Sequence, residues 1–202
     1  MKNKSLLKKG IGILLLLIMS AGVLSGCGKT SSEEEGISVY IGGTIFDGSL
    51  DPVKGAMSYG YPFTNNALTK VTPESEYTGD LASDWKISED ALTYTFNLKE
   101  GIKFHDGSDF TAEDVVFTYN EVKNNQGNNE NVDLSRMESA EATDDYTVTF
   151  KLSEPYSSFL DQTACLGIVP SDGYDSKTFD TVPIGTGPWK VIQYDTAQKI
   201  IV

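Results

Sequence analysis

Apolar and polar residues alternate from position 92 to position 98, and the alternation resumes at Ile102 and Phe104 after an interruption that ends at Gly101. A period of two is typical of a strand with one buried face. Gly101 can supply the positive φ of a tight turn. The pattern therefore predicts a β-hairpin whose return strand lies within residues 101–107. The apolar positions of its first strand are Leu92, Tyr94, Phe96 and Leu98.

A helix start follows this hairpin. Asp106-Gly107 is a turn signal, because glycine tolerates positive φ and an aspartate side chain can bond its own backbone. Thr111 and Asp114 have the three-residue spacing of a capping box, with Asp in place of the usual Glu or Gln. Residues 85–123 are therefore predicted to form a strand, a hairpin, a turn and a capped helix.

The rest of the chain mixes short strands and helices in the same way. A second hairpin is predicted from residues 137–142 and 146–152, which alternate on either side of a turn at 143–145. We expect further strands at 37–41, 189–194 and 199–202, helices at 65–70 and 157–166, and irregular structure at 170–182. Strands grouped with a few helices, without regular strand–helix–strand spacing, indicate an α+β fold.

The first 26 residues have the layout of a secretory signal peptide. Four lysines precede an apolar run at residues 11–23, and small residues lead up to Cys27. The residues around Cys27 resemble a bacterial lipoprotein box, which implies that Cys27 is lipidated and becomes the new N-terminus. The polar, acidic residues 27–36 then form a tether. An ordinary signal peptide followed by an incidental cysteine is the alternative.

The chain that follows the signal is strongly acidic. The sequence holds 16 Lys and Arg against 29 Asp and Glu, and four of the basic residues but none of the acidic ones precede Cys27. Nucleic-acid binding needs clustered Lys and Arg, and so does broad adhesion to anionic lipid. The composition therefore argues against both. The mature chain also has no second apolar run of membrane-spanning length.

Groups that could carry catalysis or bind a metal are few. His105 is the only histidine, and no serine or cysteine nucleophile adjoins the His105–Asp106 pair, so we expect a structural role for it. Cys165 has apolar neighbours, which predicts a buried, inert thiol. Metal-ligand spacing is absent, and no cofactor is predicted. A glycosidase-type carboxylate pair stays open, but the inventory favours binding over catalysis.

Several motifs occur in a fixed order between about residue 39 and residue 194. The most specific are Leu81-Ala-Ser-Asp-Trp85, residues 92–107 and Thr111-Ala-Glu-Asp-Val-Val-Phe117. They are preceded by Ser49-Leu-Asp-Pro52 and followed by residues 145–155, 168–170 and 183–189. Together they resemble the family 5 extracellular solute-binding proteins, which are peptide- and nickel-binding receptors of ABC importers.

The resemblance implies a periplasmic-binding-protein-like type II fold, in which two lobes hold the ligand. By position, residues 37–58 and 183–202 would belong to the first lobe and residues 59–182 to an extra subdomain. In peptide-binding members, backbone just after the Leu-Asp-Pro motif contacts the ligand. This implies ligand binding by Ala56, Met57, Ser58, Tyr59 and Tyr61, and main-chain bonding would tolerate many peptide side chains. Core packing of the two tyrosines is the alternative.

Members of this family are normally much longer, and this chain stops within an expected strand at residues 199–202. We therefore expect an N-terminal fragment with an incomplete first lobe and without the second lobe. The implied function is that of a lipid-anchored, monomeric receptor outside the cytoplasm. It would bind peptides, nickel or another small solute and deliver them to an ABC permease in the membrane. A non-functional remnant and a surface hydrolase remain alternatives.

Overall fold

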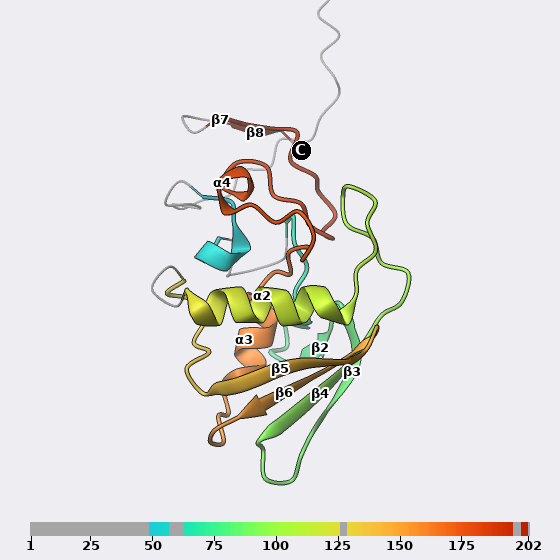
Figure 1. Ribbon diagram of the computed structural model, residues 1–202, viewed down its shortest axis with the longest axis vertical. Coiled ribbons are helices and arrows are strands. Elements are labelled where there is room, and N and C mark those ends of the chain that lie inside the picture. The colour runs from blue at the N-terminus through green and yellow to red at the C-terminus, as the bar shows by residue number, and fades with distance from the viewer. Residues whose placement is uncertain (1–48, 57–62, 126–128, 196–198, 202) are drawn as a thin grey trace, which may run out of the picture. The chain divides into compact units, whose positions relative to one another are not determined.

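The largest sheet of the structure has four antiparallel strands and lies in the lower part of Figure 1. This computed structural model describes residues 49–56, 63–125, 129–195 and 199–201. The strand order is β3-β4-β6-β5, so two hairpins are joined through their inner strands β4 and β6. The strands are β3 (Ala82–Ile87), β4 (Thr93–Leu98), β5 (Met137–Asp144) and β6 (Thr147–Leu152).

Alternation along the two inner strands gives the sheet one apolar and one polar face. The apolar residues of β4 and β6 are buried: Tyr94, Phe96, Leu98, Val148, Phe150 and Leu152. On the polar face, Thr95 Oγ1 lies 3.3 Å from Thr149 Oγ1. A slip of one residue would bury these threonines, so the alternation specifies the register. The predicted strand at 92–98 and the predicted hairpin at 137–152 are both confirmed.

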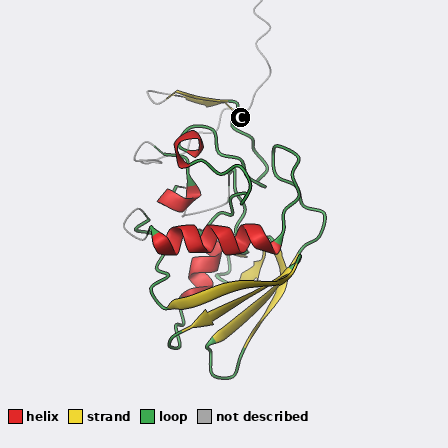
Figure 2. Ribbon diagram, viewed as in Figure 1, coloured by secondary structure: helices red, strands yellow, loops and turns green. Residues whose placement is uncertain are grey.

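Two helices cover the apolar face of the sheet (Figures 1 and 2). They are α2 (Ala112–Asn124) and α3 (Phe159–Cys165), and the second confirms the helix predicted at 157–166. The core between helices and sheet centres on Phe150. Its ring centroid lies 4.6 Å from that of Tyr119 and 5.4 Å from that of Phe159. Aromatic burial of this kind supplies much of the energy of a small core.

The predicted capping box starts α2. Thr111 N–H donates to Asp114 Oδ2 at 2.8 Å, which satisfies a backbone donor at the helix N-terminus. The other oxygen, Asp114 Oδ1, accepts from the N–H and the hydroxyl of Ser171 at 2.8 and 2.9 Å. Asp114 therefore caps the helix and ties it to a distant loop.

Residues 101–107 do not form the predicted return strand. Both edges of β4 are already paired, one with β3 and the other with β6. Gly101, at φ +74°, turns the chain away from the sheet. Residues 102–110 then close a small loop of their own, with a single bridge between Lys103 and Asp109. The apolar pattern marked burial correctly, since Phe104 is buried, but not strand pairing.

The short helix predicted at 65–70 is also wrong. The chain instead enters β1 (Thr69–Val71), which pairs with β2 (Tyr77–Gly79). Asn65 holds this passage extended because its Nδ2 donates to the distant carbonyls of Ile168 and Ile184. Residues 170–182, predicted to be irregular, contain the short helix α4 (Ser176–Phe179), whose N-cap is Asp175.

Three further elements complete the described chain. They are the 3₁₀ helix η1 (Pro52–Lys54) and the antiparallel pair β7 (Gln193–Asp195) and β8 (Lys199–Ile201). β8 lies within the strand predicted at 199–202, whereas β7 overlaps the strand predicted at 189–194 only at residues 193 and 194. The strand predicted at 37–41 lies outside the described residues.

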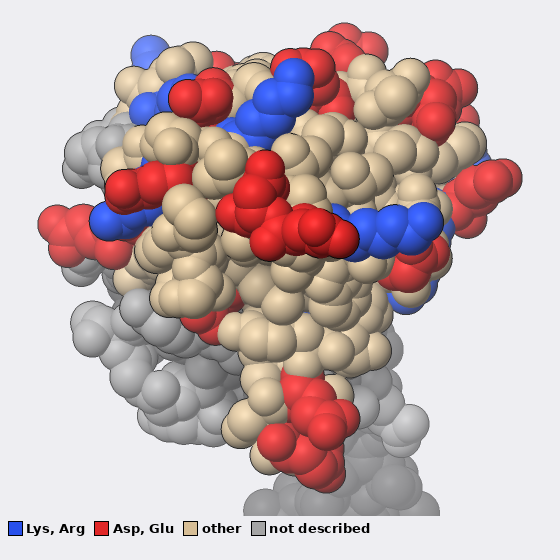
Figure 3. All heavy atoms as spheres, turned by 90° about the horizontal axis from the view of Figure 1, so that it is seen from below, with Lys and Arg blue, Asp and Glu red and all other residues tan. Residues whose placement is uncertain are grey.

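The surface and the helices add two observations. On the face seen in Figure 3, Asp and Glu outnumber Lys and Arg, in keeping with the acidic composition. Among the described residues, every helix is too short or too polar to cross a bilayer.

Candidate functional site

The predicted ligand-binding residues begin at Ala56, which is buried at the end of a tight turn. We call residues 49–56 the Asp51 turn. Outside the described residues lie the predicted lipidation site Cys27 and the other predicted ligand contacts, Met57, Ser58, Tyr59 and Tyr61. The structure therefore describes how the chain is held on either side of residues 57–62.

Asp51 organises the turn through its backbone and its side chain. Asp51 Oδ1 accepts the N–H of Val53 at 3.0 Å, which caps η1. The Asp51 carbonyl oxygen accepts the N–H of Lys54 at 3.0 Å and that of Ala56 at 3.1 Å. Gly55, at φ +87°, donates its N–H to the carbonyl of Pro52. The four amides of residues 53–56 thus all return to residues 51 and 52, which ties the backbone at Ala56 to Asp51.

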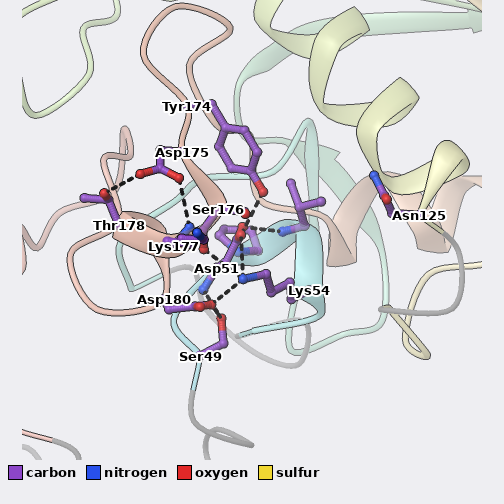
Figure 4. A network of polar contacts seen from close by, with 12 residues as sticks. Ser49, Asp51, Lys54, Asn125, Tyr174, Asp175, Ser176, Lys177, Thr178 and Asp180 are labelled. Atoms are coloured by element: carbon purple, nitrogen blue, oxygen red, sulfur yellow. Dashed lines mark hydrogen bonds and ion pairs between the residues drawn. The ribbon is translucent and has the colours of Figure 1, made fainter.

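The second carboxylate oxygen of Asp51 faces Tyr174 (Figure 4). The Tyr174 hydroxyl donates to Asp51 Oδ2 at 2.7 Å, and Asp51 is fully buried. Burial raises the pKa of Asp51, and the bonds from Tyr174 and Val53 offset only part of the rise. The pKa of Tyr174 is raised as well, by burial and then by its bond to Asp51. The phenol therefore stays a neutral donor.

Lys54 links the turn to α4 and the residue that follows it (Figure 4). Its Nζ lies 2.6 Å from Asp180 Oδ1 and donates to the carbonyl of Ser176 at 2.8 Å. Ser49 Oγ donates to the same Asp180 oxygen at 2.5 Å. Burial acts to raise the pKa of Asp180, but the bonds from Lys54 and Ser49 outweigh it and leave that pKa below its ordinary value.

Two asparagines hold the turn from the segment that follows α2. Asn129 Nδ2 donates to the carbonyl of Pro52 at 3.2 Å, and Asn131 Nδ2 donates to the carbonyl of Gly55 at 3.1 Å. Asn129 is buried. The turn is thus fastened both by the segment at 174–180 and by the segment at 129–131.

The chain after residue 62 is held by the Gly185-Thr-Gly187 turn. Gly187 N–H donates to Thr64 O at 2.8 Å, and the rings of Phe63 and Trp189 stack at 6.0 Å. A Cβ on Gly185 would lie 2.0 Å from Thr64 O, and a Cβ on Gly187 would lie 2.6 Å from Thr64 C. Only glycine permits an approach this close. The rigid turn predicted at 183–189 is therefore a packing surface for residues 63–64.

The two flanks of residues 57–62 meet at Gly167. A Cβ built there would lie 2.8 Å from Asn65 Cβ and 3.4 Å from Pro52 Cβ. The next residue, Ile168, accepts the Asn65 side-chain amide through its carbonyl at 2.9 Å. Pro52 and Asn65, which lie on either side of the predicted ligand contacts in the sequence, therefore both lie beside this glycine.

His105 has the structural role predicted for it. Gly185 N–H donates to His105 Nδ1 at 3.3 Å, so the ring proton lies on Nε2, which donates to the carbonyl of Gly187 at 2.8 Å. Both ring nitrogens are thus used to clasp the glycine turn. Cys165 is a free thiol that is half-buried rather than buried, and burial raises its pKa, which keeps it protonated.

Sequence reasoning missed most of the side chains that hold the site. It singled out the Leu-Asp-Pro motif and the glycine turn, but not Tyr174, Asp180 or the two asparagines. Tyr174 is 123 residues away from Asp51, and no local pattern connects them. The signal within reach was Asp51 itself, because a buried aspartate needs donors from elsewhere in the chain. Among the described residues, no group of three His, Cys, Asp or Glu could hold a metal ion.

The four-stranded sheet with its two helices, joined to the anchored turn, defines the class of protein. It is part of a periplasmic-binding-protein type II fold. NikZ from Campylobacter jejuni in complex with Ni(L-His) superposes with a TM-score of 0.68 at 28% identity, over 75% of this chain and 32% of that one. A dipeptide-binding protein from Pseudoalteromonas in complex with Met-Leu gives 0.64 at 27% identity, over 73% of this chain and 35% of that one.

The chain belongs to the bacterial extracellular solute-binding proteins, family 5. Residues 76–202 match the family described as "Bacterial extracellular solute-binding proteins, family 5 Middle". The dipeptide-binding protein of Escherichia coli is 28% identical over 99% of this chain and 41% of its own length. The chain thus spans about two-fifths of that relative.

Proposed function

We propose that this protein is the substrate-binding component of an ABC-type importer, which captures peptides or a similar small solute outside the cell and delivers them to a membrane permease. Membership of family 5 carries the proposal. Relatives bear the names of dipeptide- and oligopeptide-binding proteins. Peptide is favoured over a nickel complex because the sequence relatives named here are peptide receptors, whereas the nickel relative is a structural neighbour.

The ligand site belongs, in this proposal, to Ala56, Met57, Ser58, Tyr59 and Tyr61. Support comes from the two anchors that flank these residues, since a binding segment must have a defined position to preorganise its contacts. The Asp51 turn fixes Ala56, and the glycine turn fixes residues 63–65. Main-chain bonding from such a segment would capture extended peptides without selecting their side chains.

The membrane attachment is proposed from the sequence. Residues 1–26 are a lipoprotein signal, Cys27 carries the lipid, and residues 27–36 are the tether. The first lobe comprises residues 37–58 and 183–202, and the extra subdomain comprises residues 59–182. Lipid chains on Cys27 would hold the receptor beside its permease, at about 0.8 kcal/mol for each buried CH₂ group.

Binding without catalysis is the mechanism proposed. Both ring nitrogens of the single histidine form hydrogen bonds with backbone groups of the glycine turn. The buried carboxylates Asp51 and Asp114 are likewise occupied by donors of the fold. These three groups, which are candidates for a general acid or base, therefore serve the scaffold.

Isothermal titration calorimetry on the full chain in mild detergent tests the proposal. The titrants are the dipeptide Met-Leu and, separately, Ni(L-His). Heat of binding with the dipeptide is the expected result. Heat with the nickel complex alone would replace the peptide by a metal chelate as the ligand class. Absence of heat with either would contradict the receptor function, and release of free methionine and leucine would show an enzyme.

A further inference from the structure

The contact between Tyr174 and Asp51 does more than close a local turn. We propose that Tyr174 is a positioning residue, which acts through Asp51 to set where the backbone leaves the Asp51 turn at Ala56. The consequence for ligand rests on the proposed function, because only then does Ala56 contact a ligand. The positioning of Ala56 by Tyr174 is itself a property of the ligand-free chain.

Tyr174 is held by aromatic packing on two sides. Its ring centroid lies 5.5 Å from that of Phe117 in α2 and 4.9 Å from that of Phe179 in α4. Both neighbours meet it edge to face, at interplanar angles of 68° and 60°. Such packing restricts the ring and so aims the hydroxyl. The phenol that reaches Asp51 is therefore a fixed point of the core.

Hydrogen bonds within the turn link the position of Asp51 to that of Ala56. Tyr174 holds Oδ2, and Oδ1 holds the Val53 amide in the same turn. The amides of Lys54 and Ala56 then bond the Asp51 carbonyl. A rotation of the Asp51 side chain would therefore release Val53 first and loosen the three residues after it.

A buried carboxylate is a poor choice if stability alone matters. Asp51 is fully buried, and its raised pKa shows that the charged form is less stable here than in water. Replacing a buried charged group together with its partner often leaves the stability of the fold unchanged or increases it. Such a group can instead serve to specify a single arrangement of the chain. Asp51 lies two residues after Ser49 and five before Ala56. The arrangement that it specifies is therefore that of the backbone leading into the proposed ligand segment.

Amide hydrogen exchange on the full chain, in mild detergent, tests this inference. Tyr174→Phe removes the hydroxyl and keeps the ring. The amides of residues 53–56 should then exchange about tenfold faster, while those of β4 stay at the wild-type rate. The matched control is Tyr77→Phe, which also removes a phenol–carboxylate bond, to Asp161 Oδ1, but on β2. It should leave residues 53–56 unchanged.

Two variants of Asp51 separate positioning from simple loss of packing. Asp51→Asn keeps an oxygen that accepts from Val53, so the amides of residues 53–56 should exchange nearly as slowly in this variant as in wild type. In Asp51→Ala, the same amides should exchange at least as fast as they do in Tyr174→Phe. The inference is overturned if Tyr174→Phe leaves the amides at 53–56 protected, or if it accelerates β4 equally, since the second result is global destabilisation.

Titration of the same variants with Met-Leu connects the inference to function. If wild type binds the dipeptide, Tyr174→Phe should bind it about tenfold more weakly than Tyr77→Phe does. Equal affinities would overturn the role in ligand positioning. If wild type does not bind, the proposed function fails, and the exchange rates at 53–56 still decide whether Tyr174 positions Ala56.

Discussion

Three glycines, Gly167, Gly185 and Gly187, let the chain close around residues 63–65 where any side chain would collide with a neighbour. Each added Cβ would collide with a backbone atom or a Cβ atom, and at Gly185 it would also meet the Asn65 side-chain amide. Neighbouring groups therefore cannot give way without moving the chain. The position of residues 63–65, which flank the proposed ligand segment, therefore depends on the absence of side chains at these three glycines.

Gly185→Ala should destabilise the protein by about 3 kcal/mol or more, because its Cβ would lie 2.0 Å from Thr64 O and overpack a backbone contact. The control is Gly101→Ala, at φ +74° but with open space around the new Cβ. It should cost only about 1–2 kcal/mol, from the left-handed backbone. Urea unfolding measures both. Equal losses would mean that the close approach at Gly185 is unimportant.

Tyr119→Phe should leave the protein as stable as wild type or stabilise it by about 1 kcal/mol. The Tyr119 hydroxyl is buried and finds no hydrogen-bond partner in the described part of the chain. A buried unsatisfied hydroxyl is unfavourable, so its removal relieves a penalty while the ring stays in the core. Thermal and urea unfolding provide the measurement. A clear loss of stability would reveal a partner, such as a buried water.

Asp51 should make the stability depend on pH in a defined direction. Its pKa in the folded chain is raised above the ordinary value of 3.8, so the folded state keeps its proton to higher pH than the unfolded state. The stability that Asp51 contributes is therefore complete below pH 3.8 and is lost as the pH rises through the folded pKa. The side chain in Asp51→Asn cannot titrate. The unfolding free energy of this variant should therefore rise relative to that of wild type as the pH increases. A gap that is constant with pH would contradict the raised pKa.

At the scale of elements, α2 is the joint between the sheet and the site. Its buried side packs on β5 and β6, and its N-terminus is tied through Asp114 to Ser171. The alternation at 92–98 and the spacing of Thr111 and Asp114 predicted a strand and a capped helix correctly, because these are local patterns. The pairing of β4 with β6 joins residues that are 50 to 58 positions apart, and the alternation could not specify that partner.

Asp114→Ala should cost about 2 kcal/mol or more, since it removes the helix cap and leaves the donors of Ser171 without their acceptor. Glu113→Ala is the control in the same turn of α2. Glu113 is exposed, so its loss should change stability by about 0.5 kcal/mol or less. Far-UV circular dichroism during urea unfolding compares the two. Similar small effects would show that the cap is dispensable.

At the scale of the whole molecule, the two flanks of residues 57–62 converge although their anchors come from distant parts of the sequence. Asp51 bonds Tyr174, Asn65 bonds Ile168 and Ile184, and His105 bonds Gly187. Sequence motifs placed the chain in its family and marked the Leu-Asp-Pro turn. They could not show this convergence, because each anchor is a single polar side chain with a remote partner.

The most direct test of the account is hydrogen exchange on the full chain with and without Met-Leu. If residues 56–62 form a peptide site, saturating dipeptide should slow exchange there and leave the polar face of β4 and β6 unchanged. Protection confined to the sheet, or no protection anywhere despite bound peptide, would contradict the central claim that the segment between the two anchors binds the ligand.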